Sequence, residues 1–133
     1  MTLPLRLEIW PSPLGRGSTA AGAFTSRGGC GVYADDNAGA ASATGDGDLM
    51  TNYCTSISII HAMARGATPQ DACLELLQHM IKTDAKNKDG QVAVLAINPY
   101  GEIGAACMND RFHLKYALWQ NGESQLLDSV KLI

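Results

Sequence analysis

The residues of this chain best suited to chemistry lie together in Thr44-Gly45-Asp46-Gly47-Asp48. This stretch closes a run of Gly, Ala, Asp and small polar residues over 31–48 and leads directly into an apolar segment with helical periodicity. A turn from a strand into a helix N-terminus presents backbone N–H groups without internal partners, and the helix dipole adds partial positive charge. Glycines there let a ligand approach the backbone closely. The stretch therefore predicts a site for an anion or a developing oxyanion, to which Thr44 adds a hydroxyl donor.

The helix that would position this turn is expected from about Leu49 to Ala64, with Asp48 as its N-cap and Gly66 as its C-terminal stop. Apolar residues recur there at intervals of three and four and predict one buried stripe. The stripe comprises Leu49, Met50, Tyr53, Ile57, Ile60, His61 and Ala64.

A second helix is expected to begin at once. Thr68-Pro69-Gln70-Asp71 combines an N-cap, a proline at the first helical position and an acid three residues after the cap. Its expected buried face is Cys73, Leu76, Leu77, Met80 and Ile81, and the charged segment 82–90 is expected to be a solvated connection.

Three strands are expected after the helices. The segment 91–98 is nearly continuous in apolar residues, which predicts a strand covered on both faces, and Asn98-Pro99-Tyr100-Gly101 predicts a hairpin turn into 102–108. Alternation over 112–119 predicts a third strand of the same meander, and Asn121-Gly122 permits one further turn. We therefore expect an α+β fold with two helices on one face of an antiparallel meander of three to four strands, whose other face is apolar and uncovered.

The first 28 residues differ in character from the rest of the chain. Pro4, Pro11 and Pro13 are expected to break any regular element, and the Gly/Ser/Arg/Ala mixture after them has no sustained period. We therefore divide the chain into an atypical N-terminal segment, 1–28, which is a candidate for disorder, and a domain over 29–133.

Composition excludes several classes of function. The chain has 133 residues, 46% of them hydrophobic, a net charge of −3 and few aromatic residues, which argues against a nucleic-acid surface. No apolar stretch approaches the roughly 20 residues that a membrane helix needs, so no membrane partner is expected. Met1–Trp10 is interrupted by Pro4 and makes a poor signal peptide, so the compartment stays unassigned.

Familiar metal, cofactor and catalytic motifs are absent from the sequence. The cysteines Cys30, Cys54, Cys73 and Cys107 are widely spaced, without a C-x-x-C pair, so no zinc site is expected. Asp46-Gly47-Asp48 lacks the later ligands of a calcium loop, and Gly28-Gly29-Cys30-Gly31 lacks the ending of a P-loop. The histidines at 61, 79 and 113 have no partner in the sequence and are interpreted as structural. The chain is expected to use no cofactor.

The segments 29–36 and 38–48, GCGVYADD and AGAASATGDGD, closely resemble the β-subunit of the glycosylasparaginases, within the family of asparaginases with an N-terminal nucleophile. The resemblance continues through 65–73, RGATPQDAC, and through 96–98 with 101–107, AIN and GEIGAAC. It covers about three quarters of the chain, from Gly29 almost to the end.

This resemblance implies a portion of a four-layer αββα sandwich that a precursor forms by cleaving itself into α- and β-subunits, with an (αβ)2 assembly. The implied activity is hydrolysis of the side-chain amide of N-glycosyl-asparagine, asparagine or a β-aspartyl peptide. An N-terminal threonine attacks in such enzymes, and a Thr-Gly pair, here Thr44 and Gly45, forms the oxyanion hole. Relatives of this kind occur in animal lysosomes and in bacterial envelopes.

The implied nucleophile is missing from the matching position. The family's Asp-Thr-Ile/Val-Gly strand and its Gly-Arg-Val-Gly-Asp-Ser loop do not occur in 1–27: Gly15-Arg16-Gly17-Ser18 lacks the Asp, and Arg27 lies too close to the match. Thr2 would need removal of Met1 and lacks the family context. We therefore identify no nucleophile and expect the chain to be inactive alone. The alternative is a non-catalytic binding or interaction protein, or a truncated partner of full-length subunits.

Overall fold

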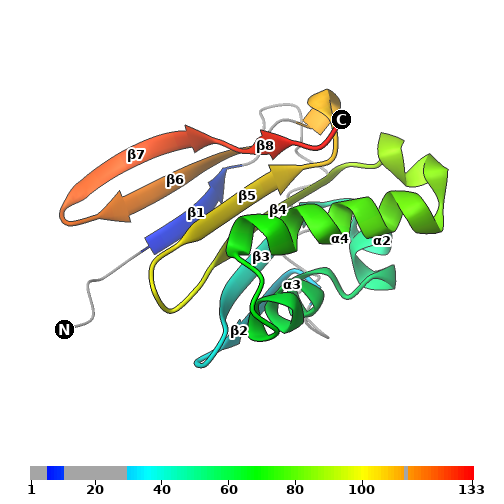
Figure 1. Cartoon of the computed structure of the whole chain (residues 1–133). Helices are drawn as coiled ribbons and strands as arrows, with labels where there is room; N and C mark the ends of the chain where they lie inside the picture. The colour runs from blue at the N-terminus through cyan, green and yellow to red at the C-terminus, as the bar shows by residue number, and fades with distance from the viewer. Residues whose placement is uncertain (1–5, 11–29, 113) are drawn as a thin grey trace.

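The computed structural model describes residues 6–10, 30–112 and 114–133, and their strands form two sheets (Figure 1). The larger sheet has the order β2-β3-β4-β5-β8, and the smaller has the order β1-β6-β7. All pairs are antiparallel except β5 with β8. The strands of the larger sheet are β2 (Val32–Asp35), β3 (Gly39–Gly45), β4 (Val92–Ile97), β5 (Ile103–Cys107) and β8 (Val130–Lys131). Those of the smaller sheet are β1 (Arg6–Trp10), β6 (Lys115–Gln120) and β7 (Glu123–Asp128).

Two helices cover one face of the larger sheet (Figure 1). The helical elements are α2 (Gly47–Asn52), α3 (Thr55–Ala64) and α4 (Pro69–Thr83), with the short 3-10 turns η2 (Ala85–Asp89) and η3 (Asp110–Phe112). The core contains Ile59, Ile60, Leu77 and Met80 from α3 and α4, packed with alternate residues of β3, β4 and β5. The expected mixture of helices with a mainly antiparallel sheet is therefore confirmed, whereas the four-layer sandwich stays a prediction.

The second long helix begins as its sequence predicts. Thr68 has extended φ and ψ, its Oγ1 accepts the Asp71 N–H at 3.2 Å, and Pro69 opens α4. The expected buried face is confirmed for Cys73, Leu76, Leu77 and Met80, and Ile81 is partly buried. The expected connection starts later than predicted, because α4 continues to Thr83 and η2 occupies much of 85–90.

The single helix expected over 49–64 is wrong. The chain forms α2, breaks at Cys54 in the left-handed conformation (φ 45°, ψ 55°) and restarts as α3. Because this break resets the helical register, the buried face of α3 includes Ile59, Ile60 and Met63, while His61 and Ala64 are exposed. The expected stop is confirmed, since α3 ends before Gly66, which has φ +104°.

The β4–β5 hairpin follows its predicted outline. Residues 92–96 are buried, as a strand covered on both faces requires. The expected turn is also present: the Gly101 N–H donates to the Asn98 carbonyl at 3.1 Å, and the Asn98 side chain accepts the N–H groups of Tyr100 and Glu102.

The third strand does not extend this hairpin, and here the predicted meander is wrong. After η3 the chain enters β6, which pairs with β1 and β7 in the smaller sheet rather than with β5. Asn121 and Gly122 form the predicted turn, with φ of 55° and 82°, the positive values that a two-residue hairpin favours. The outer edge of β5 instead receives β8, which returns from β7 after one intervening residue.

The sheet face away from the helices is not uncovered as expected. Ala93, Leu95, Ala105 and Cys107 are at most 3% exposed, and Leu114 packs with Ala93 and Cys107. Figure 1 shows the smaller sheet on this side of the larger one. The physical reason is that the β6–β7 hairpin folds back over this face instead of extending it.

The N-terminal segment contains a strand that the prolines were expected to prevent. β1 lies between Pro4 and Pro11 and pairs with β6 from Arg6 opposite Trp119 to Trp10 opposite Lys115. The rest of 1–28 lies outside the described residues, so the division at residue 28 stays a prediction. Within the described part of the chain, every helix is too short or too polar to cross a membrane.

Candidate functional site

Thr44 and Gly45 are the last two residues of β3. Thr44 lies opposite Ala93 of β4 and Gly45 lies opposite Val92. Ala43 packs in the core beneath the helices, and successive side chains of a strand point to opposite faces, so Thr44 lies on the face away from the helices. The residue is only 6% exposed. Thr44 and Gly45 therefore lie at the end of an inner strand of the larger sheet, between β2 and β4.

Gly45 must be glycine at this position for two separate reasons. Its φ of +125° is a conformation that L side chains rarely adopt. A Cβ on Gly45 would also overlap the Gln91 carbonyl group. The end of β3 is therefore pressed against the entry to β4, and Gly45 is buried there.

The helix cap differs from the prediction. Asp46, not Asp48, is the N-cap: its Oδ1 accepts the N–H groups of Asp48 and Leu49 at 3.1 and 3.2 Å, and α2 begins at Gly47. Asp48 lies in the first helical turn, where its charge favours the helix dipole. The helical N–H groups of Asp48, Leu49 and Met50 are thus occupied by the Asp46 side chain and carbonyl, because the chain enters the helix two residues earlier than its apolar pattern suggested.

The donors of the predicted pair lie at the end of β3. The Ala43 N–H donates to the Gly31 carbonyl on the β2 side, and the Asp46 N–H donates to the Gln91 carbonyl on the β4 side. Because successive N–H groups of a strand point to opposite edges, the Gly45 N–H points to the β2 side. The pairing of β2 with β3 stops at Val32 and Ser42, short of this group.

The Thr44 hydroxyl has no hydrogen-bond partner among the described residues. Other buried hydroxyls nearby do have partners: Thr55 Oγ1 donates to the Met50 carbonyl at 2.9 Å, and Ser56 Oγ donates to the Cys30 carbonyl at 2.8 Å. Thr44 therefore combines a nearly buried position with a hydroxyl that is not used to hold the backbone.

The described residues do not bring a nucleophile to this pair. Thr2, Gly15–Ser18, Arg27 and His113 lie outside them. His61 and His79 are exposed on α3 and α4, and the rings of His79 and Tyr53 form a T-shaped pair with centroids 5.8 Å apart. The site as described is therefore a pair of candidate donors without the group that attacks.

The cysteines are dispersed through the structure and do not form a site. Cys73 and Cys107 are buried, and Cys54 is exposed at the break between α2 and α3. Burial raises the pKa of Cys73 to about 12, which keeps this thiol neutral. In the part of the chain that the structure describes, no three His, Cys, Asp or Glu residues are grouped to hold a metal ion.

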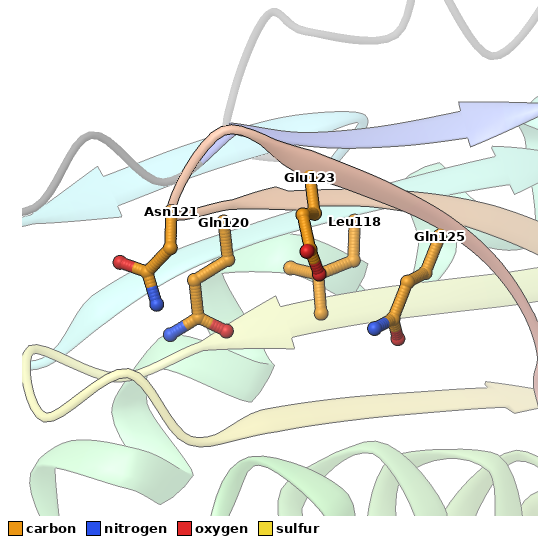
Figure 2. Close-up of a pocket in the computed structure, with 5 residues that line it drawn as sticks. All are labelled: Leu118, Gln120, Asn121, Glu123 and Gln125. Atoms are coloured by element: carbon orange, nitrogen blue, oxygen red, sulfur yellow. The ribbon is translucent and has the colours of Figure 1, made fainter.

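A hollow of about 190 Å³ lies on the β6–β7 hairpin, away from the predicted pair (Figure 2). Figure 2 shows its side chains pointing from the hairpin toward the layer of β4 and β5. They are Leu118, Gln120, Asn121, Glu123 and Gln125. This hollow was not predicted from the sequence, because β6 was expected to extend the main sheet. The Asn121-Gly122 turn signal, which predicts a hairpin of its own between two short strands, could have revealed it.

Comparison with known proteins gives one consistent family. The model of the family described as "Asparaginase" matches residues 25–126. A protein of Elizabethkingia miricola named N(4)-(β-N-acetylglucosaminyl)-L-asparaginase is 38% identical over 89 residues, which are 64% of this chain and 26% of that protein. Putative enzymes of the same name from Drosophila yakuba and Drosophila grimshawi are 43% and 45% identical over 79 and 80 residues, each 59% of this chain and 19% of theirs. The matches thus span about a fifth to a quarter of the length of these relatives.

Proposed function

Because this chain belongs to the asparaginase family, we propose that it forms part of an amidohydrolase that cleaves the side-chain amide of N-glycosyl-asparagine, asparagine or a β-aspartyl peptide. The observation that carries the proposal is the family match over 25–126, which contains the whole of β3 and the turn into α2. Within this match lie Thr44 and Gly45, the adjacent residues that we propose as donors; both are at the end of β3 and are buried in the chain alone.

In the proposed reaction, the two donors stabilise the negative charge that develops on the amide carbonyl oxygen. A nucleophilic oxygen attacks the carbonyl carbon, and the tetrahedral intermediate holds its oxyanion against the Thr44 hydroxyl and the Gly45 N–H. The C–N bond then breaks, the amine leaves with a proton, and water releases the acyl group as a carboxylate. In this proposal the oxyanion lies beside the end of β3, on the side of β2 and on the face that Thr44 occupies.

The attacking group and the walls of the cleft come from outside the described residues in this proposal. We place them on an α-subunit-like chain or on further sequence, in an (αβ)2 assembly with four αββα layers. Two observations support this division: the matched length is a fifth to a quarter of the relatives, and Thr44 is nearly inaccessible in the chain alone. The chain by itself is therefore expected not to hydrolyse an aspartyl β-anilide.

A chimaera tests the proposal. The 89-residue matching stretch of the Elizabethkingia miricola relative is replaced by the corresponding stretch of this chain, and the unmodified relative is the positive control. We expect the chimaera to hydrolyse N-acetylglucosaminyl-asparagine or an aspartyl β-anilide. A folded chimaera without activity, measured beside an active parent, contradicts the proposed role of this segment.

The near burial of Thr44 favours a second candidate, a non-catalytic partner of full-length subunits. In that case the chain associates with such subunits without contributing to hydrolysis. Size exclusion and calorimetric titration with aspartate distinguish the two candidates: association without binding of aspartate or gain of activity supports the partner, and the active chimaera supports the hydrolase.

A further inference from the structure

The hollow on the β6–β7 hairpin is lined by one apolar and four polar side chains. Leu118 lies opposite Gln125, and Gln120 lies opposite Glu123, so these four side chains share one face of the hairpin. Figure 2 shows this face turned toward the layer of β4 and β5, with Asn121 at the turn completing the lining. The hairpin hollow therefore presents three amide groups, one carboxylate and one apolar wall.

Packing against the larger sheet does not explain these polar residues. A hairpin that only covers a sheet is expected to turn its apolar side chains toward that sheet. β6 and β7 do so at their other end, where Tyr116 and Leu127 lie opposite each other on the same face and are partly buried. Toward the turn the pattern reverses, because polar groups face inward while Trp119 and Leu126, on the opposite face, are 37% and 61% exposed.

The polar side chains of the hairpin hollow are unpaired. Within the residues that the structure describes, they form neither a hydrogen bond nor an ion pair. Other carboxylates nearby in the sequence are paired: Asp128 lies 3.2 Å from the Lys115 ammonium, and Asp110 lies 2.7 Å from that of Lys131. The lining of the hollow contains no cation, so the charge of Glu123 is not neutralised there.

We propose that the hairpin hollow binds an alkylammonium group, which belongs either to a free amine or to a lysine side chain of another protein. An ammonium carries three N–H donors and no acceptor, and it meets in Glu123 a carboxylate surrounded by amide groups that can each turn an oxygen toward it. The charge-assisted bond to Glu123 is the strongest of these contacts. The alkyl stem lies against Leu118, as the stems of lysines lie on apolar surface.

The volume and charge of the hollow exclude other classes of ligand. A volume of about 190 Å³ is smaller than the roughly 300–1,000 Å³ of pockets that hold drug-sized ligands, so the ligand or the part of it that enters is small. An anion would meet the unpaired carboxylate of Glu123. The site lies away from Thr44 and Gly45 and does not depend on the proposed hydrolysis.

The side-chain NH2 signals of Gln120, Asn121 and Gln125 in NMR spectra of the 133-residue chain test the proposal. The probe is butylammonium chloride, and the controls are butanol, which has the same stem without the charge, and sodium chloride at the same ionic strength. We expect butylammonium to shift these signals saturably, with a Kd on the order of 1 mM, which a ligand of this size can reach. Shifts that do not saturate, or that butanol or sodium chloride reproduces, overturn the proposal.

Two variants change the charge of the hollow in opposite directions. Glu123→Gln keeps the size of the side chain and is expected to raise the Kd at least about tenfold, because the charge-assisted bond is lost. Gln125→Glu adds a second carboxylate and is expected to lower the Kd. Glu75→Gln, at an exposed position of α4, is the matched control and is expected to change the Kd less than about twofold. An unchanged Kd in both hollow variants overturns the role of Glu123.

The source of the ammonium is distinguished with N-acetyl-lysine methylamide, which carries the same head and stem on a peptide backbone. Affinity comparable to that of butylammonium assigns the hollow to a lysine side chain of another protein. Exclusion of this probe while butylammonium binds assigns it to a free amine. Both results support an ammonium site, and neither bears on the amidohydrolase proposal, which the chimaera tests separately.

Discussion

The side-chain amide of Gln70 hydrogen-bonds both backbone groups of Ala105. Its Oε1 accepts the Ala105 N–H at 3.1 Å, and its Nε2 donates to the Ala105 carbonyl at 3.2 Å. β8 pairs only with Ala106 and Cys107, so this amide takes the place of a neighbouring strand at the open part of the β5 edge. The start of α4 is thereby fixed to the larger sheet.

Gln70→Ala is expected to destabilise the chain by about 1–3 kcal/mol, because it leaves two partly buried backbone groups unsatisfied. Gln70→Glu keeps the acceptor but loses the donor, and we expect an intermediate effect. Urea denaturation measures both changes. Gln78→Ala, at an exposed position of the same helix, is the matched control and is expected to change the free energy of unfolding by less than about 0.5 kcal/mol.

Two glycines with positive φ provide a matched test of the close contact at the candidate site. Gly45→Ala meets the Gln91 backbone, whereas a Cβ on Gly66 meets nothing within 4 Å. Gly66→Ala is expected to cost about 1 kcal/mol from backbone strain alone, and Gly45→Ala is expected to cost at least about 2 kcal/mol more, because backbone must move. Thermal or urea unfolding of the two variants checks this difference, and equal losses would refute the close contact.

Asn87 connects η2 to the helices. Its Nδ2 donates to the Tyr53 hydroxyl at 3.0 Å and to the Met80 carbonyl at 2.8 Å. A double-mutant cycle with Asn87→Ala and Tyr53→Phe is expected to give a coupling free energy of about 0.5–1.5 kcal/mol. Additive losses would show that the Asn87–Tyr53 bond does not contribute to stability.

The buried thiol of Cys73 predicts a dependence of stability on pH. Burial raises its pKa from 9.0 to about 12, so between these values the folded thiol keeps a proton that the unfolded thiol has released. The folded state then binds more protons, and stability falls as pH rises from about 9 toward 12. The difference in unfolding free energy between the wild type and Cys73→Ala is expected to shrink over this range, by at most about 1.4 kcal/mol per pH unit. A difference that stays constant from about pH 8 to 11 would contradict this prediction.

Local signals predicted the local elements well. The cap at Thr68, the turn at Asn98–Gly101 and the hairpin turn at Asn121-Gly122 rest on side chains and dihedral preferences that act within a few residues. The apolar run of β4 likewise specified burial on both faces.

The predictions failed where two local signals competed, or where the deciding contact joins residues far apart in the sequence. Asp46 and Asp48 are equally suited to cap a helix, and the earlier start at Asp46 is accompanied by a bond of its N–H to the distant Gln91. The helix break at Cys54 contains neither Gly nor Pro, the residues from which a break would be predicted. The pairing of β6 with β1 joins segments more than 100 residues apart, beyond the reach of periodicity, so the second sheet could not be foreseen. The close contact of Gly45 with the Gln91 backbone likewise joins residues far apart in the sequence and could not be predicted from it.

The most direct test of the proposed oxyanion site is the kcat of the chimaera carrying Thr44→Val. Valine keeps the shape of threonine and removes only the hydroxyl, and Ser42→Ala is the control, because Ser42 lies on the same strand and face two residues earlier. We predict a loss of about 10²–10³-fold in kcat for Thr44→Val, as for removal of one oxyanion donor, with Ser42→Ala within about twofold of the unsubstituted chimaera. A folded Thr44→Val chimaera that keeps its full kcat would contradict the assignment of Thr44 to the site.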